Sequence, residues 1–399
     1  MNATHAWLCD GLRTPFGRFR GALAGVRADD LAALPIRRLL ERHPQLDAAA
    51  IDDVYLGCAN QAGEDNRNVA RMAALLAGLP VSVPGVTLNR LCASGLESLG
   101  QAARACRLGE AGVLIAGGVE SMTRAPYVLG KAELAHSREQ ALEDTTLGWR
   151  FVNPRMRAAY GVDSMTQTAE NLAREHGIGR EDQDACALRS QQRAARAVAA
   201  GWLADELTAV AGAADGSEFV ADEQPRPDTT LARLAGLKPL LGPGSTITAG
   251  NASGINDGAC ALLVASEAAV ARWQLAPRAR VLGMAAVGVP PRVMGIGPVD
   301  AIRRLLERLR LGLADFDVIE INEAFAAQVL AVTRALGLPD DAEHVNPNGG
   351  AIALGHPLGA SGARLALTAL RQLERSGGRR ALVAMCVGVG QGVALALER

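Results

Sequence analysis

Short apolar runs alternate with longer amphipathic stretches along most of the chain. The short runs are rich in Val, Ile and Leu, as buried strands are, whereas apolar residues in the longer stretches recur at helical spacing. Such an alternation favours an α/β fold. The clearest examples are expected strands at 54–57, 113–117 and 318–321, and expected helices at 68–79 and 302–311.

One helix–strand unit occurs twice. Ala-Ser-Gly at 93–95 opens a helix that precedes the strand 113–117, and Ala-Ser-Gly at 360–362 opens a helix that precedes a strand at 381–385. The interval from helix entry to strand entry is 18 residues in the first copy (95 to 113) and 19 in the second (362 to 381). This spacing indicates two similar halves. Residues 121–248, richer in Arg, Met, Asp and Glu, are expected to form an inserted region.

Composition narrows the classes of partner. The 399 residues are 49% hydrophobic with a formal net charge of −1, so no basic surface for nucleic acid or an anionic membrane is expected. No apolar run approaches the roughly 20 residues that span a bilayer. The seven cysteines form no C-x-x-C pair and the six histidines no H-x-x-x-H motif. We therefore expect no metal site, and reduced thiols in a cytoplasm rather than a disulfide framework.

Three Gly-rich segments carry the candidate chemistry. Cys92 stands at a helix start, where the macrodipole would lower the pKa of its thiol. His356 lies in a loop rich in Gly, Pro and Asn, at 346–362, which could hold an imidazole near a substrate. Cys386 ends an apolar strand. Alternatively, each cysteine could be a small core residue and His356 an ordinary hydrogen-bonded loop residue.

The segment 388–392, Gly-Val-Gly-Gln-Gly, has the glycine spacing of a dinucleotide-binding loop. A strand-like run at 393–397 follows it instead of a helix, so a Rossmann site is not expected. Glycines here could instead free backbone N–H groups to bind an oxyanion. One histidine and two cysteines in Gly-rich turns point to nucleophilic catalysis through a thiolate.

These segments resemble the active-site blocks of the thiolases, the acyl-CoA:acetyl-CoA C-acyltransferases. Further blocks in the family's order stand at 117–122, 251–258 and 322–325. The resemblance spans almost the whole chain and implies a duplicated five-layer αβαβα sandwich with a loop domain inserted over the active site. It divides the chain into a first half at 1–270, with the loop domain at about 121–248, and a second half at 271–399.

The resemblance also implies roles for single residues. Cys92 would be the nucleophile, and His356 the base that takes its proton and later donates to the thioester oxygen. Cys386 would exchange a proton at C2 of acetyl-CoA. The backbone N–H groups of Cys92 and Gly388 would form one oxyanion hole, and His356 with a water held by Asn322 would form the second.

For coenzyme A, the resemblance implies contacts from Met165, Arg226, Ser253 and Phe325. Arg226, flanked by prolines, could equally be a solvated loop charge, and Met165 and Phe325 could be core residues. CoA and acetyl-CoA would be substrates, with no permanently bound cofactor. The enzyme would be a homo-oligomer, either a dimer or a tetramer.

The stretches 57–66, 148–154 and 160–165 look most like those of 3-oxoadipyl-CoA thiolases, whose products are succinyl-CoA and acetyl-CoA. A carboxylate at the far end of the acyl chain is costly to bury without a cation, and Arg150 is the candidate, unless it is a surface or structural arginine. An acetoacetyl-CoA or general 3-ketoacyl-CoA thiolase is the main alternative. A β-ketoacyl synthase of the same superfamily and an inactive thiolase-fold binding protein are the others. The block Cys-Val-Gly at 386–388 argues against the synthase, and the presence of all three candidate residues argues against the inactive protein.

Overall fold

The computed structural model describes residues 5–211 and 217–399, so residues 212–216 of the expected inserted region lie outside it. The large sheet runs in the order β4-β3-β5-β8-β1-β9-β12-β11-β10. The strands of its first half are β1 (Ala6–Arg13), β3 (Asp53–Gly57), β4 (Val86–Leu88), β5 (Val113–Ser121) and β8 (Asn256–Ser266), with β2 (Gly17–Arg18) beside β8. Those of the second half are β9 (Ala279–Gly288), β10 (Val318–Ile321), β11 (Arg380–Val387) and β12 (Gln391–Glu398).

The two halves of the sheet repeat one pairing scheme. In the first, β3 and β5 are parallel, and β5–β8 and β8–β1 are antiparallel. In the second, β10 and β11 are parallel, and β11–β12 and β12–β9 are antiparallel. The halves meet where Trp7 and Leu8 of β1 pair with Arg280 and Ala279 of β9. The duplication expected from the repeated helix–strand unit is confirmed.

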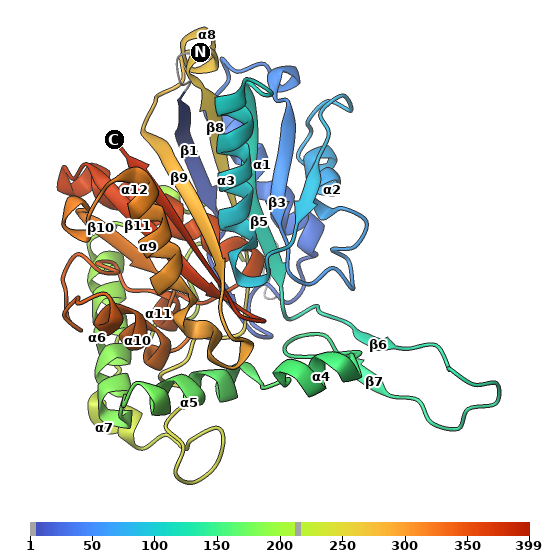
Figure 1. Ribbon diagram of the computed structural model, residues 1–399. Coiled ribbons are helices and arrows are strands. Elements are labelled where there is room, and N and C mark those ends of the chain that lie inside the picture. Colours follow the sequence, from blue (N-terminus) through green and yellow to red (C-terminus); the bar gives the residue numbers. More distant parts are fainter. Residues whose placement is uncertain (1–4, 212–216) are drawn as a thin grey trace.

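Helices cover both faces of each half-sheet. The helices α3 (Ser94–Leu108) and α12 (Leu358–Ser376) pack on each other and contact strands of both halves. The outer faces are covered by α1 (Ala28–Arg42) and α2 (Val69–Leu76) on one side and by α9 (Gly297–Leu309) on the other. This gives the expected five αβαβα layers, and Figure 1 shows the two halves side by side.

Alternation along the strands assigns side chains to these layers. Val383 and Met385 of β11 face the central helices, whereas Leu382 and Ala384 face the outer ones. Every residue of β8 is buried, because helices cover both of its faces. The uninterrupted apolar runs in the sequence therefore reflect strands with no face open to solvent.

The segment between β5 and β8 contains an arm and a group of helices. The arm is the hairpin of β6 (Tyr127–Leu129) and β7 (Leu142–Asp144), which projects from the body in Figure 1. After it come α4 (Pro154–Tyr160), α5 (Met165–Glu175), α6 (Arg180–Ala199) and α7 (Leu231–Ala235). The second half adds α8 (Glu267–Trp273), α10 (Ala326–Ala335) and α11 (Ala351–Leu354). Within the described ranges, no helix is both long and apolar enough to cross a membrane.

The five elements expected from the pattern are all present, and their limits shift at prolines and glycines. The strand expected at 318–321 is β10 to the residue. The helix expected at 302–311 begins five residues earlier, at Gly297, because Pro298 suits a first helical turn. The helix expected to open at 360–362 begins earlier, at Leu358, with Pro357 as its N-cap residue.

Candidate active site

The N-termini of α3 and α12 meet between the halves, through glycines that leave no room for a side chain. A Cβ on Gly95 would lie 2.5 Å from the carbonyl oxygen of Gly359, and a Cβ on Gly362 would lie 2.3 Å from a backbone nitrogen of α3. Real side chains do not approach backbone so closely. This packing brings Cys92, just ahead of α3, and His356, just ahead of α12, to the same end of the two helices.

Cys92 lies in the turn η2 (Leu91–Ala93), immediately before α3. Local hydrogen bonds fix this turn: the Leu91 N–H donates to Asn89 Oδ1 at 2.9 Å, and the Ser94 hydroxyl donates to the Leu91 carbonyl at 2.6 Å. The Cys92 side chain lines a cavity. The expected placement of Cys92 at a helix start is thus correct.

Burial raises the pKa of Cys92 to about 11, although the backbone N–H groups of Gly388 and of Cys92 itself act on its sulfur to lower it. The expectation that the helix start lowers this pKa is wrong, because removing the thiolate from water outweighs the backbone donors. The same two N–H groups converge on the sulfur, as the expected oxyanion hole requires.

His356 is buried, and its hydrogen bonds define the tautomer. The Ser361 hydroxyl donates to the carbonyl of Pro357 at 2.9 Å, so it can only accept from His356 Nδ1, which lies 2.7 Å away. The proton therefore resides on Nδ1. The other nitrogen, Nε2, lies 3.4 Å from Asn322 Nδ2 and keeps its lone pair as an acceptor.

Burial, together with the positive charge of Arg364, lowers the pKa of His356 to about 3. The imidazole is consequently neutral near pH 7 and able to accept a proton. Asn256 holds the loop in place, because its Oδ1 accepts the His356 backbone N–H at 2.9 Å. The sequence motif containing Asn256 was recognisable, but its contact with the histidine loop was not.

Cys386 and Asn322 approach from the second half of the sheet. Burial raises the pKa of Cys386 far above its usual range, and the nearby Cys92 raises it further. The backbone N–H of Asn322 donates to the carbonyl of Ala384 on β11 at 2.9 Å. Its side-chain Oδ1 is buried and has no hydrogen-bond partner among the described residues. Such an orphaned acceptor is expected to bind water or substrate.

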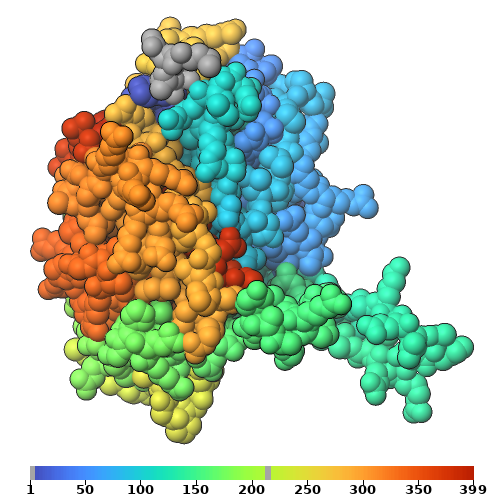
Figure 2. Space-filling model, viewed as in Figure 1, coloured from blue at the N-terminus to red at the C-terminus, as the bar shows by residue number. Residues whose placement is uncertain are grey.

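The cavity beside Cys92 has a volume of about 330 Å³. Its walls are mainly apolar, and Gly388, Glu120 and Arg150 also line it. The apolar lining side chains include Leu91, Met122, Leu147, Trp149, Met165 and Val389. In Figure 2 the red turn that joins β11 and β12 reaches the surface between the two halves, beside the green α4.

The four residues expected to contact coenzyme A fall into two places. Met165 and Phe325 belong to the same core cluster as Cys386, and the Ser253 backbone N–H donates to the carbonyl of Ala324, next to Phe325. Arg226 instead lines a separate cavity of about 380 Å³ beside α7. The structure therefore groups three of the four with the catalytic candidates and leaves Arg226 apart.

Glu120 is a site residue to which the sequence assigned no role. Its carboxylate accepts three backbone N–H groups, those of Ala59, Asn60 and Gly359. It thereby joins the loop after β3 to the start of α12. Burial raises the pKa of Glu120 to about 7. The clue in the sequence was an acidic residue at the end of an otherwise apolar strand.

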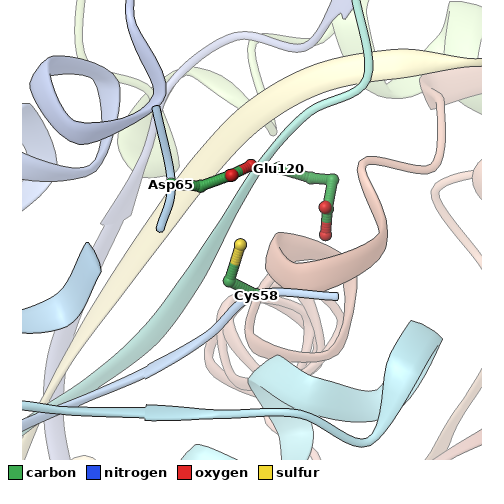
Figure 3. A group of neighbouring side chains, drawn as sticks. All are labelled: Cys58, Asp65 and Glu120. Carbon is green, nitrogen blue, oxygen red and sulfur yellow. The ribbon is translucent and has the colours of Figure 1, made fainter. Parts of the chain in front are cut away.

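Glu120 also faces Cys58 and Asp65, as Figure 3 shows, in a group whose ligand atoms lie within 4.8 Å of one another. Hydrogen bonds within the chain already use these atoms: Cys58 donates to the Asn60 carbonyl at 3.0 Å, and Asp65 accepts the Gly63 N–H at 2.9 Å. Because these ligand atoms already take part in hydrogen bonds, we interpret the group as a structural cluster and not as a metal site.

Comparison with known proteins matches residues 7–268 to the thiolase N-terminal domain and residues 275–399 to the thiolase C-terminal domain. A beta-ketoadipyl-CoA thiolase of Pseudomonas knackmussii is 67% identical over 98% of each chain. A 3-oxoadipyl-CoA/3-oxo-5,6-dehydrosuberyl-CoA thiolase of Escherichia coli is 63% identical over 99% of each. The crystal structure of human mitochondrial 3-ketoacyl-CoA thiolase in complex with CoA is similar over 99% of this chain and 98% of that one, at 38% identity and a TM-score of 0.92.

Proposed function

The chain belongs to the thiolase family, and we propose that it cleaves 3-oxoadipyl-CoA with coenzyme A to succinyl-CoA and acetyl-CoA. The observation that carries this proposal is that Cys92 and Gly388 line one cavity. A neutral His356 precedes α12, whose start packs against the start of α3. Full-length relatives named for this substrate, at 63% and 67% identity, support the choice of acyl group.

In the first half-reaction, we propose that His356 Nε2 takes the Cys92 proton and the thiolate attacks C3 of the substrate. The oxyanion that forms at C3 accepts from the N–H groups of Cys92 and Gly388. The C2–C3 bond then breaks. Its electron pair passes to acetyl-CoA as an enolate, whose oxygen accepts from His356 Nε2–H and from a water bound to Asn322 Oδ1. Cys386 gives its thiol proton to C2, and acetyl-CoA leaves.

In the second half-reaction, the thiol of CoA gives its proton to the Cys386 thiolate and attacks the acyl group on Cys92. Cys92 departs and regains its proton from His356, so that the site returns to its starting state. Two thiols suit this sequence, because one must carry an acyl group while the other exchanges a proton with carbon. No resident cofactor enters either step.

Coenzyme A is proposed to occupy both regions that hold the expected contact residues. Arg226 has no ion-pair partner within 4 Å among the described residues, so its charge is available to a CoA phosphate. Met165 and Phe325 share a core cluster with Cys386, and Ser253 binds the residue next to Phe325. These three would border the thiol end of the pantetheine arm. Arg226→Met should raise the KM for CoA, whereas an unchanged KM would contradict this placement.

We further propose that the enzyme is a cytoplasmic homo-oligomer. All seven cysteines are free thiols, which suits a reducing compartment. The β6–β7 arm exposes Leu129 and Leu142, which pair across the hairpin, and Leu134 at 75% exposure. An apolar arm that projects into solvent is a candidate contact with another subunit. A monomer mass by light scattering would contradict the proposal.

The substrate is tested by thiolysis of 3-oxoadipyl-CoA, its neutral analogue 3-oxohexanoyl-CoA, and acetoacetyl-CoA, with products identified by mass spectrometry. We expect the highest kcat/KM with 3-oxoadipyl-CoA and equal amounts of succinyl-CoA and acetyl-CoA. A preference for acetoacetyl-CoA or for 3-oxohexanoyl-CoA would assign the chain to the general thiolases. Failure to cleave every CoA thioester would favour a β-ketoacyl synthase or a binding protein.

A further inference from the structure

The cavity beside Cys92 contains an arginine whose charge the protein does not balance. The half-buried Arg150 lines this cavity, and its one side-chain hydrogen bond to the described residues runs from Nη2 to Asn60 Oδ1 at 3.3 Å. Within the described ranges, no carboxylate lies within 4 Å of its guanidinium. A guanidinium offers five donors, so most of those on Arg150 remain available to a ligand.

The position of this guanidinium is fixed by its surroundings. Asn60 is buried, and its Nδ2 donates to both the carbonyl and the hydroxyl oxygen of Thr145, at 3.2 and 3.1 Å. On the other side, Trp149 Nε1 donates to the carbonyl of Asp163 at 3.3 Å. Phe151, directly after Arg150, has a φ of +49°, which L-residues rarely adopt. The loop therefore holds Arg150 toward the cavity at some conformational cost.

The other polar groups of the cavity do not neutralise Arg150. Glu120 is the remaining charged residue in the lining, and both of its oxygens already accept backbone N–H groups. Most of the wall is apolar, so an anion that entered would lose its water. It would gain a charge-assisted, bidentate contact with Arg150. A fixed cation in an apolar cavity that also contains the nucleophile selects for an acyl chain that ends in a negative charge.

We propose that Arg150 binds the terminal carboxylate of the acyl group that is transferred to Cys92, and so sets the preference for dicarboxylic substrates. The inference rests on the proposed thiolase function. It places the succinyl part of 3-oxoadipyl-CoA in the 330 Å³ cavity, with its carbonyl at Cys92 and its carboxylate at Arg150. Asn60 is a positioning residue that keeps the guanidinium in reach.

The test compares Arg150→Met with the wild-type enzyme on 3-oxoadipyl-CoA and 3-oxohexanoyl-CoA, which have equal chain length. Loss of a charge-assisted contact weakens binding roughly ten- to a hundredfold. The ratio of kcat/KM for 3-oxoadipyl-CoA to kcat/KM for 3-oxohexanoyl-CoA should therefore fall by about that factor. Arg150→Lys keeps the positive charge but lacks the planar guanidinium group. This variant should therefore retain part of the wild-type ratio. Arg155→Met, at an exposed position on α4, is the matched control and should leave the ratio unchanged.

The other outcomes of this comparison distinguish a wrong role for Arg150 from a wrong function for the enzyme. An equal loss on both substrates in Arg150→Met would show a structural role or a contact with CoA, and would overturn the proposal while the thiolase function stands. An unchanged ratio would also overturn it. If the wild-type enzyme cleaves neither substrate, the proposed function itself fails, independently of Arg150.

Discussion

The chemistry of Cys92 depends on groups that lie far from it in the sequence. Its local environment, a turn before a helix, argues for a lowered pKa, whereas burial in the folded protein raises the pKa to about 11. Their Gly-rich segments and the family resemblance made Cys92, His356 and Cys386 candidates, and their roles stay predictions. Their protonation states could not be predicted, because desolvation and the charge of Arg364 arise from tertiary packing.

The first prediction concerns the resting state of the site. With pKa values of about 11 for Cys92 and about 3 for His356, the pair should be a neutral thiol and a neutral imidazole. Because the thiolate is the reactive form, alkylation of Cys92 by iodoacetamide should accelerate about tenfold for each pH unit up to about pH 10. Peptide mapping at each pH would measure the Cys92 adduct separately from the other thiols.

The opposite arrangement has a different signature. A resting thiolate–imidazolium pair would be alkylated at a nearly constant rate between pH 6 and 9. Such a plateau would show that His356 already holds the Cys92 proton before substrate binds, contrary to the burial-dominated pKa values.

The second prediction separates the two thiols. Cys386→Ser should still form an acyl-enzyme at Cys92 from a simple acyl-CoA, because the CoA thiolate is a good leaving group that can depart without the proton of Cys386. The variant should lose exchange of the C2 protons of acetyl-CoA with deuterated water, and turnover should fall by roughly 10²–10⁴. Normal exchange in a folded, acylated variant would remove Cys386 from the proton transfer.

At the scale of elements, the repeated helix–strand unit was visible in the sequence, whereas the contact between its two helices was not. Spacing identified the units α3–β5 and α12–β11. It could not show that Gly95 and Gly362 face each other's helices, because that contact joins residues far apart in the chain. The same holds for Glu120, to which the sequence assigned no role: the three backbone groups that it binds come from two other segments.

The third prediction tests the close approach of these helices. In Gly362→Ala the added Cβ would meet backbone of α3 at 2.3 Å, so the helices must separate. Overpacking of this kind costs about 1–3 kcal/mol and should also lower kcat by moving Cys92 relative to His356. Thermal unfolding and steady-state assays would measure both effects. Gly25→Ala, at an open position, is the control, and equal stability of the two variants would contradict the account.

At the scale of the whole molecule, the layered fold could be predicted because the resemblance extends through both halves. The boundary near residue 270 between the halves stays a prediction, as do the limits of the inserted region. The path of residues 145–151 around the cavity could not be derived from spacing, since loops follow no period. That loop supplies Arg150, which the resemblance indicated as a candidate although its place in the wall of the cavity could not be predicted.

The central claim is that Cys92 carries the acyl group cut from 3-oxoadipyl-CoA. The most direct measurement mixes the enzyme with this substrate in the absence of free CoA, quenches in acid, and maps the modified peptide by mass spectrometry. The account predicts one succinyl group per active site on Cys92, with one equivalent of acetyl-CoA released. A succinyl group on Cys386 or Cys58, or acetyl-CoA release without any acyl-enzyme, would contradict it.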